Sequence, residues 1–308
     1  MDSIITIAGP TAIGKTDLSL SLAKRLGGEI ISADSMQVYK YMDIGTAKPS
    51  KDELNLIPHH MIDEINPDEN FSVAHYQKMA REYIQDVLSR EKVPILVGGT
   101  GFYINAVLSD IQFSEENESR DNSEYRKWLY DEAKKHGNEY LHSKLKDIDI
   151  VSYEKIHSNN VIRVIRALEY YKETGERISD LNARQKNSGL FYRSATFILD
   201  MDRGVLYDRI NKRVDKMFES GLLKEVRLLL EMGYSRDMVS MQGLGYKETI
   251  RHIYGELSLE ETIDTIKQAT RNYAKRQITW FKHQLQGDLI TAVLPKNEII
   301  SRICESRA

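Results

Sequence analysis

GPTAIGKT, residues 9–16, is the stretch that decides the fold of this chain. It matches the pattern G-x-x-x-x-G-K-[ST] in full, in which backbone N–H groups curl around phosphate oxygens while a lysine adds charge. The apolar run Ser3–Gly9 precedes it and predicts a buried strand, and Asp17–Leu26 follows with helical spacing. A phosphate loop between a strand and a helix favours an α/β enzyme whose substrate carries a phosphate or diphosphate group.

Strand and helix patterns alternate beyond this loop. Glu29–Ala33 and Val93–Val97 are short apolar runs typical of buried strands, and Val73–Arg90 between them has helical spacing. Ser194–Leu199 is a later strand of the same kind. Strands that alternate with helices predict a parallel sheet with helices on both faces. We therefore expect an α/β fold with a P-loop NTPase-like parallel sheet flanked by helices.

The chain becomes polar, highly charged and helical in pattern near residue 114. Tyr125–His136 and Asn160–Thr174 both have helical spacing, and strand signals are few until the Ser194 run. We therefore expect a P-loop catalytic core of residues 1–113 and 194–308, interrupted by a helical insertion of residues 114–193.

Composition narrows the class of protein. The 308 residues are 41% hydrophobic and 29% charged, and the net charge of -3 means that any nucleic-acid contact comes from local basic patches. The single cysteine, Cys304, excludes an intrachain disulfide. The first residues lack a secretory pattern, and no apolar run approaches the roughly 18 residues of a membrane span. We expect a cytoplasmic protein that has no membrane contact.

Several side chains are candidates for the phosphate group and its metal ion. Lys15 supplies a point charge, and the hydroxyl of Thr16 is the expected ligand of Mg²⁺. Arg209 and Arg213 lie one helical turn apart, where they either grip a diphosphate or form surface ion pairs with neighbouring carboxylates. The loop type also binds nucleotides such as ATP.

The carboxylates distinguish among enzymes that share this loop. Nucleoside triphosphatases place an acidic residue at the end of another core strand to hold Mg²⁺, but the Val93–Val97 run ends in GGTG. Asp34 instead follows the Glu29–Ala33 strand, and the carboxyl ends of parallel strands meet at one ligand-binding edge. There Asp34 acts as a general base or caps a turn. Thr100 either faces the same cleft or caps the next helix.

A basic, aromatic segment lies near the end of the chain. Ser258 and Glu261 have capping-box spacing and predict a helix that runs to about Gln284. Its second half carries the basic residues Arg271, Lys275, Arg276 and Lys282 among aromatic rings. Such a stripe grips RNA phosphates and stacks on bases, or it is a solvated helix face over a buried seam.

Seven segments follow one another along the chain: GPTAIGKT (9–16), SADSMQVYKYMDIGTAKP (32–49), PHHMID (58–63), VGGTGFY (97–103), IRVIRALEYY (162–171), QGLGYKE (242–248) and RNYAKRQITWFK (271–282). In content and order this series resembles the tRNA dimethylallyltransferases, the IPP transferase family. The resemblance covers nearly the whole chain, and DSMQVY, DIGTAKP and AKRQITWF are far more specific than the phosphate loop. Members of that family transfer a dimethylallyl group from its diphosphate to the N6 amine of adenosine 37, in tRNAs reading codons that begin with U.

The resemblance implies roles for the matching residues. Asp34 is the expected general base and Thr100 contacts the adenosine, so these two are the expected catalytic residues. The expected diphosphate- or nucleotide-binding residues are Gly9, Pro10, Thr11, Ala12, Ile13, Gly14, Lys15 and Thr16, to which Arg209 is added from its position alone. The expected tRNA-binding residues are Asp34, Ser35, Met36, Gln37, Thr100, Arg126, Ile162, Arg163, Arg166, Gln242, Gly243, Gly245, Lys247, Lys275 and Arg276.

The resemblance also implies the ligands and partners. They are dimethylallyl diphosphate, Mg²⁺ and the anticodon stem-loop of tRNA, bound by a monomer. The PHH segment is expected to form a turn near the mouth of the site; a zinc site there is disfavoured, because adjacent residues on a strand point to opposite faces. One departure from the family is His157-Ser158-Asn159-Asn160, where members usually have a proline after the histidine.

Three other functions stay open at this point. A small-molecule or nucleotide kinase shares the loop and the sheet, and it would turn over ATP. An adenylate prenyltransferase shares the chemistry but acts on free AMP, which requires neither a helical insertion nor a basic helix. A non-enzymatic RNA-binding protein with a vestigial loop would not need Asp34 or Thr100.

Overall fold

A computed structural model describes residues 3–111, 113, 124–186 and 189–305. Contacts divide the chain into two units, which we call the core unit (1–108 with 191–308) and the helical unit (109–190). The expected boundary near residue 114 falls among residues outside the described part. None of the helices in the described ranges has both the length and the apolar character that a membrane crossing needs.

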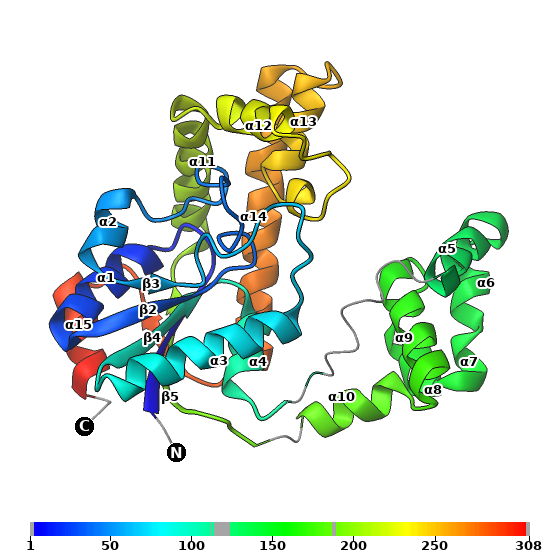
Figure 1. The fold of residues 1–308 in the computed structure, drawn as a ribbon, viewed down its shortest axis with the longest axis horizontal. Helices are drawn as coiled ribbons and strands as arrows, with labels where there is room; N and C mark the ends of the chain where they lie inside the picture. The colour runs from blue at the N-terminus through cyan, green and yellow to red at the C-terminus, as the bar shows by residue number, and fades with distance from the viewer. Residues whose placement is uncertain (1–2, 112, 114–123, 187–188, 306–308) are drawn as a thin grey trace. The chain divides into compact units, whose positions relative to one another are not determined.

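A parallel sheet forms the centre of the core unit. In the described residues it has six strands in the order β3-β2-β4-β1-β5-β6 (Figure 1). Their bounds are β1 Ser3–Ala8, β2 Gly28–Ala33, β3 His59–His60, β4 Val93–Gly98, β5 Arg193–Asp200 and β6 Asp288–Thr291. The predicted α/β fold is confirmed, including the four strands expected from the sequence, and every pairing in the sheet is parallel.

Helices cover both faces of the sheet because neighbouring strand residues point to opposite sides. Ile4 and Ile31 pack with helices α3 (Val73–Ser89) and α4 (Gly101–Leu108) on one face. Ile5 packs on the other face with α1 (Lys15–Leu26) and with the C-terminal helix. The remaining short helices here are α2 (Lys51–Leu56) and α15 (Lys296–Glu305). The continuous apolar strand runs of the sequence therefore reflect burial on two sides.

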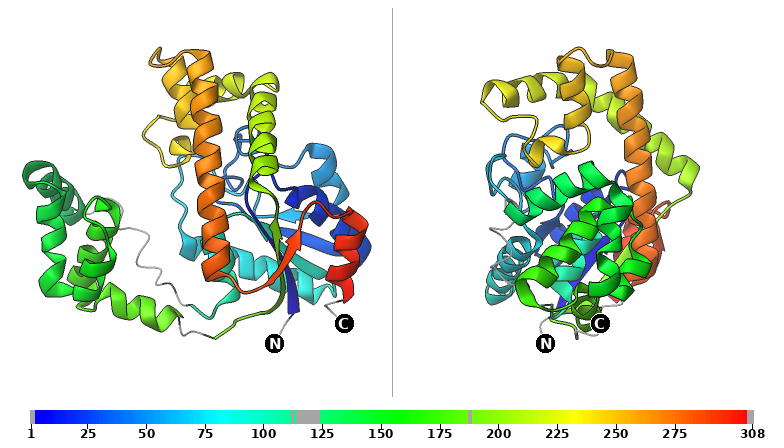
Figure 2. Two further views of the ribbon diagram at one scale, coloured as in Figure 1. Left: turned by 180° about the vertical axis from the view of Figure 1, so that it is seen from behind. Right: turned by 90° about the vertical axis from the view of Figure 1, so that its right-hand side faces the viewer.

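Two long helices rise beside the strand ends and continue past them (Figures 1 and 2). They are α11 (Arg203–Glu219) and α14 (Leu259–Gln284), which pack against each other. The helices α12 (Leu222–Glu231) and α13 (Tyr246–Ile253) and the 3-10 turn η2 (Ser240–Gln242) lie toward their far ends. The predicted start of α14 is confirmed, because Ser258 and Glu261 form a reciprocal capping box.

The family resemblance implied a turn at the PHH segment, and this expectation is wrong. The segment forms a short strand, β3, at the edge of the sheet. His59 and His60 pair in parallel with Ile30 and Ile31 of β2. The two rings diverge, as on any strand: His60 Nε2 lies 2.8 Å from the buried carboxylate of Glu29, while His59 bonds the Ile57 carbonyl. Among the described residues no cluster of three histidine, cysteine or acidic side chains forms a metal site.

The helical unit has a small core of its own. Its helices are α5 (Glu124–His136), α6 (Asn138–Ser143), α7 (Leu145–Ile148), α8 (Ile150–Lys155), α9 (Val161–Thr174) and α10 (Ile178–Lys186). Leu129 and Leu141 pack against Val164 and Leu168 of α9. Arg126 holds the carboxylate of Glu169 in two-pronged contact at 2.6–3.0 Å, and the Glu169 side chain is only 2% exposed.

Replacing Arg126 by alanine is expected to destabilise the helical unit by about 2–3 kcal/mol, because the buried carboxylate of Glu169 loses a charged, bidentate partner. Thermal unfolding followed by circular dichroism measures this loss. Arg163→Ala, an exposed arginine of α9, should leave the transition unchanged. The double variant Arg126→Met with Glu169→Met should recover most of the stability. An unaltered transition in Arg126→Ala would show that the pair contributes little.

Candidate functional site

The loops that follow β1, β2 and β4 meet at the carboxyl edge of the sheet. The strand order reverses beside β1, and ligands of open α/β sheets bind in the crevice at such a point. A cavity of about 730 Å³ opens there, with side chains from α11 and α14 forming its far wall. It is lined by residues 11–16 of the phosphate loop, by Asp34 and by Gly98 and Gly99, so one cavity joins the three segments.

The phosphate loop has the shape that its sequence predicts. Gly14 precedes α1 with φ 104°, a backbone conformation that favours glycine. Ala12 also has a positive φ, of 62°. The ammonium of Lys15 donates hydrogen bonds to the carbonyls of Gly9 and Pro10 at 2.9 and 2.8 Å. Burial lowers the pKa of Lys15 to about 7, although Asp34 acts in the opposite direction.

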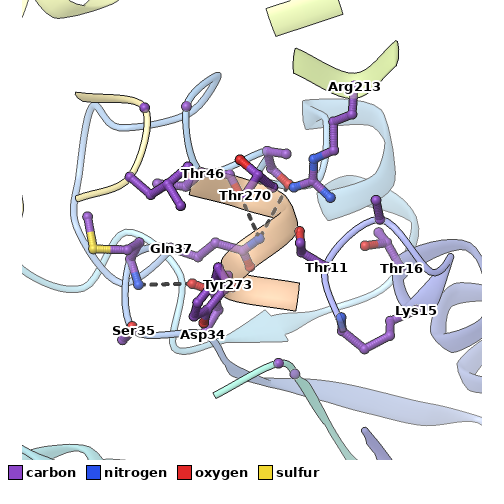
Figure 3. A pocket seen from close by; sticks show the side chains of 18 of the residues that line it. Thr11, Lys15, Thr16, Asp34, Ser35, Gln37, Thr46, Arg213, Thr270 and Tyr273 are labelled. Atoms are coloured by element: carbon purple, nitrogen blue, oxygen red, sulfur yellow. Dashed lines mark hydrogen bonds between the residues drawn. The ribbon is translucent and has the colours of Figure 1, made fainter. Parts of the chain in front are cut away.

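A second cation approaches the cavity from α11. Arg213 lines the cavity and reaches toward the phosphate loop in Figure 3. Burial lowers its pKa, Asp34 raises it, and the Arg213 charge in turn lowers the pKa of Lys15, so the three groups share one electrostatic environment. Arg209 lies outside the lining, and its guanidinium donates a long hydrogen bond of 3.4 Å to the carbonyl of Ile13. Of the two arginines, Arg213 is therefore the better placed for an anion, and the predicted role of Arg209 stays a prediction.

Asp34 stands where β2 ends and faces the cavity. Its Oδ1 accepts the N–H of Met36 at 2.9 Å, which closes a turn, so the capping role considered from the sequence is present. Its charge also acts on Lys15 and Arg213. A carboxylate held by a turn beside two cations is positioned both to pair with them and to accept a proton from a bound molecule.

Thr100 lies just behind the cavity lining. Thr100 directly precedes α4, and its carbonyl accepts the N–H groups of Tyr103 and Ile104 in the first turn of that helix. Its hydroxyl accepts the N–H of Ser35 at 3.3 Å, and Tyr273 of α14 lies beside it. Burial raises the pKa of Tyr273 to about 12, so its hydroxyl stays protonated.

The wall beside Asp34 is held by hydrogen bonds that the sequence did not reveal. The Gln37 amide accepts from Ser32 at 3.1 Å and donates to the carbonyls of Thr46 and Ala47 at 3.3 Å (Figure 3). Glu225 of α12 then accepts three successive backbone N–H groups, those of residues 43, 44 and 45, at 3.0, 2.7 and 3.1 Å.

Most predicted residues of the core unit gather at this cavity. Those that line it are Thr11, Ala12, Ile13, Gly14, Lys15, Thr16, Asp34, Ser35, Met36, Gln37, Gly243, Gly245, Lys247 and Arg276. Those of the core unit outside its lining are Gly9, Pro10, Thr100, Arg209, Gln242 and Lys275. Lys275 borders a second depression on α14, beside Trp280, and Arg276 lines both that depression and the main cavity. Arg126, Ile162, Arg163 and Arg166 belong to the helical unit.

Several lining residues were not predicted to be functional. Thr270, Tyr273 and Gln277 project from one side of α14, four or three residues apart. Their spacing is a helical face, which the sequence reveals, but the same pattern also describes a core-facing stripe. Only the position of α14 beside the sheet turns this face into part of a site.

The fold and the cavity define an α/β protein of the P-loop type, in which the phosphate loop opens into a cavity lined by Lys15 and Arg213. Comparison with known proteins then places the chain among its relatives. The family model of IPP transferase matches residues 37–284. The chain belongs to the IPP transferase family.

Relatives and solved structures agree with this assignment. The tRNA dimethylallyltransferase of Acetivibrio thermocellus is 53% identical over 282 residues, which are 92% of this chain and 89% of that protein. That of Lachnoclostridium phytofermentans is 52% identical, over 92% and 90%. The crystal structure of tRNA delta(2)-isopentenylpyrophosphate transferase from Staphylococcus epidermidis is 41% identical, with TM-score 0.73, and covers 100% of this chain and 99% of its own. A eukaryotic dimethylallyltransferase acting on tRNA superposes with TM-score 0.84 at 29% identity, covering 100% and 80%.

Proposed function

We propose that this enzyme transfers the dimethylallyl group of dimethylallyl diphosphate to the N6 amine of adenosine 37 in tRNAs reading codons that begin with U. The observation that carries the proposal is the cavity in which a phosphate loop, two cations and a carboxylate converge. The family membership supports the tRNA and the prenyl donor. The geometry supports two separate roles. Lys15 and Arg213 act on the leaving diphosphate, and Asp34 acts on the attacking amine.

The phosphate loop serves the leaving group. An allylic diphosphate ionises readily because the cation is delocalised, so the main task is to stabilise the charge that develops on the diphosphate. Backbone N–H groups, Lys15 and Arg213 supply that stabilisation, and no nucleotide hydrolysis is needed. The Thr16 hydroxyl lines the cavity and would hold Mg²⁺, which usually keeps a few protein ligands and completes its shell with water and phosphate oxygens. Bound there, the ion would neutralise charge on the leaving diphosphate.

Asp34 serves the nucleophile. The exocyclic amine of adenosine is weak because its lone pair is shared with the ring, so a carboxylate that takes its proton as the new bond forms is the appropriate aid. Ser35 and Gln37 line the cavity near Asp34 and contact the target nucleotide, and Thr100 supports this side from just behind the lining. The base must leave the anticodon stack to reach the cavity, which costs a few kcal/mol and is least for a single-stranded loop nucleotide.

The tRNA is held by the basic face of α14 and by the helical unit. In this proposal residues 1–113 and 194–308 are the catalytic core and residues 114–193 the tRNA-binding insertion. The protein acts as a monomer in the cytoplasm, and the anticodon stem-loop is its partner.

One experiment separates this function from its rivals. The protein is incubated with dimethylallyl diphosphate, Mg²⁺ and unmodified tRNA, and the nucleosides are then analysed by mass. A dimethylallyl adduct on adenosine 37 supports the proposal. Turnover of ATP without tRNA points to a kinase, and an adduct formed on AMP but not on tRNA points to an adenylate prenyltransferase. The GGTG end of β4, which has no carboxylate, disfavours the kinase.

Neutralising Lys275 or Arg276 by alanine should weaken tRNA binding and flatten its dependence on salt, because each phosphate contact releases counterions. The slope of log affinity against log salt is expected to fall by about one for each contact removed. Equilibrium binding at several salt concentrations measures this. Lys24→Ala, an exposed lysine of α1, is the matched control. Equal affinity of variant and parent at every salt concentration would identify a solvated helix face.

A further inference from the structure

Gln277 of α14 is a buried polar side chain that joins two distant segments of the site. Its Oε1 accepts the N–H of Thr11 at 2.9 Å, and its Nε2 donates to the carbonyl of Gly99, also at 2.9 Å. The side chain is 6% exposed, and both ends of its amide are engaged. The phosphate loop after β1 and the glycine turn after β4 are therefore tied together by one residue, separated from them by 266 and 178 positions in the sequence.

The phosphate loop needs such an anchor at its first turn. Ala12, directly after Thr11, has the left-handed φ of 62°, which costs a residue with a β-carbon about 1–2 kcal/mol and persists only where the surroundings hold it. Lys15 also steadies this turn through the carbonyls of Gly9 and Pro10. A bound diphosphate attracts that same ammonium and so competes with both carbonyls. The contact of Gln277 with Thr11 uses no cation and survives this competition.

The Nε2 end of the Gln277 side chain packs closely against Gly99. A β-carbon on Gly99 would lie 2.3 Å from its Nε2, so only glycine leaves room for the amide at this position. Tyr273, one turn earlier on α14, lies beside the side chains of both Thr100 and Gln277, which act on its hydroxyl. One face of α14 thus touches the leaving-group side of the cavity and the side where the nucleotide is expected.

We propose that Gln277 is a positioning residue of the transfer reaction. It fixes the first turn of the phosphate loop against the Gly99 turn, and this sets the place of the diphosphate relative to Asp34 and Thr100. The inference rests on the proposed function for its consequence in catalysis. The tie itself concerns anion binding and is measurable without turnover.

Two variants test the tie. Gln277→Leu keeps most of the side-chain volume and removes both hydrogen bonds. It should weaken the binding of inorganic diphosphate, measured by calorimetry, about tenfold. It should also lower kcat on the order of 10²-fold, as a misplaced reactant does, while KM for tRNA stays near that of the parent. Gln268→Leu, at an exposed glutamine of the same helix, should change none of these quantities.

Gln277→Glu distinguishes positioning from simple packing. Its carboxylate still accepts the N–H of Thr11 but opposes the carbonyl of Gly99, and protonation restores a donor to that carbonyl. The activity of this variant relative to the parent should therefore rise as the pH falls, whereas the leucine variant shows no such recovery. This second variant also decides the matter if the leucine variant does not fold.

Three results would overturn the inference. The first is that Gln277→Leu leaves diphosphate affinity and kcat unchanged. The second is that its loss of kcat is accompanied by an equal rise in KM for tRNA. The third is that Gln277→Leu and Gln277→Glu show the same dependence of activity on pH. Failure of the proposed transferase function would give a result that differs from these three. A parent protein that modifies no tRNA, yet loses diphosphate affinity through Gln277→Leu, refutes the transferase reaction and supports the tie.

Discussion

Asp34→Asn is expected to slow the chemical step of prenyl transfer by about 10²- to 10⁴-fold, the usual worth of a positioned general base. Asparagine keeps the size of the side chain, and its Oδ1 still accepts the N–H of Met36, so the turn after β2 is retained. What it loses is the capacity to take the proton of the attacking amine. Single-turnover transfer at saturating tRNA and dimethylallyl diphosphate measures the step directly.

A matched variant separates the chemical role of Asp34 from its structural one. Asp202 caps α11 by accepting the N–H groups of Gly204 and Val205, and it lies outside the cavity lining. Asp202→Asn makes the same chemical change at a capping carboxylate and should leave the rate unaltered. Binding of tRNA to Asp34→Asn should fall far less than the rate. Weaker tRNA binding with an unaltered rate at saturation would reject Asp34 as the base.

The parts of the site that were predictable are those built by neighbours in sequence. The phosphate loop is a single run whose glycines, lysine and threonine act together, so one pattern predicts its strand, its turn and its helix. Asp34 was found because a carboxylate at the end of a parallel strand must lie at the ligand-binding edge. The start of α14 was found in the same way, since the capping box of Ser258 and Glu261 involves only four residues.

The parts that escaped prediction depend on contacts between distant segments. Arg209 and Arg213 lie one turn apart, and helical spacing alone does not tell which one faces the cavity; the packing of α11 against α14 does. Gln277 meets Thr11 and Gly99 only because α14 passes beside the sheet. The edge strands were missed for another reason: β3 has two residues, and β6 buries one side chain, so neither shows an apolar period.

Arg126 shows the same limit of prediction from the sequence alone. The family resemblance implied that Arg126 contacts tRNA, and a charged side chain in a polar segment agrees with such a contact. In the structure its guanidinium is engaged by the buried Glu169, so any contact with tRNA would compete with an ion pair that stabilises the helical unit. Sequence gives the charge of a residue, whereas its availability depends on partners 43 positions away.

Lys15→Ala should lower the rate of prenyl transfer by about 10²- to 10³-fold, or ~3–4 kcal/mol, because it removes a charge aimed at the leaving diphosphate. The fold should persist, since the hydrogen bonds that Lys15 donates go to the carbonyls of Gly9 and Pro10 in its own loop. Lys24→Ala, on the exposed face of the same helix, is the control. Near-normal transfer by Lys15→Ala would indicate that the loop no longer serves the reaction.

The pH dependence of binding tests the same lysine independently of turnover. Burial lowers the pKa of Lys15 to about 7 in the free protein, and a bound diphosphate raises it again, so binding takes up a proton above that pH. The contribution of Lys15 to affinity is therefore complete below about pH 7 and declines, at most about tenfold per pH unit, as the pH rises toward the pKa in the complex. Dimethylallyl diphosphate titrates in the same range, so the informative quantity is the ratio of parent affinity to that of Lys15→Ala. A ratio that stays constant from pH 6 to pH 9 would show that the Lys15 ammonium is already fully charged before the diphosphate arrives.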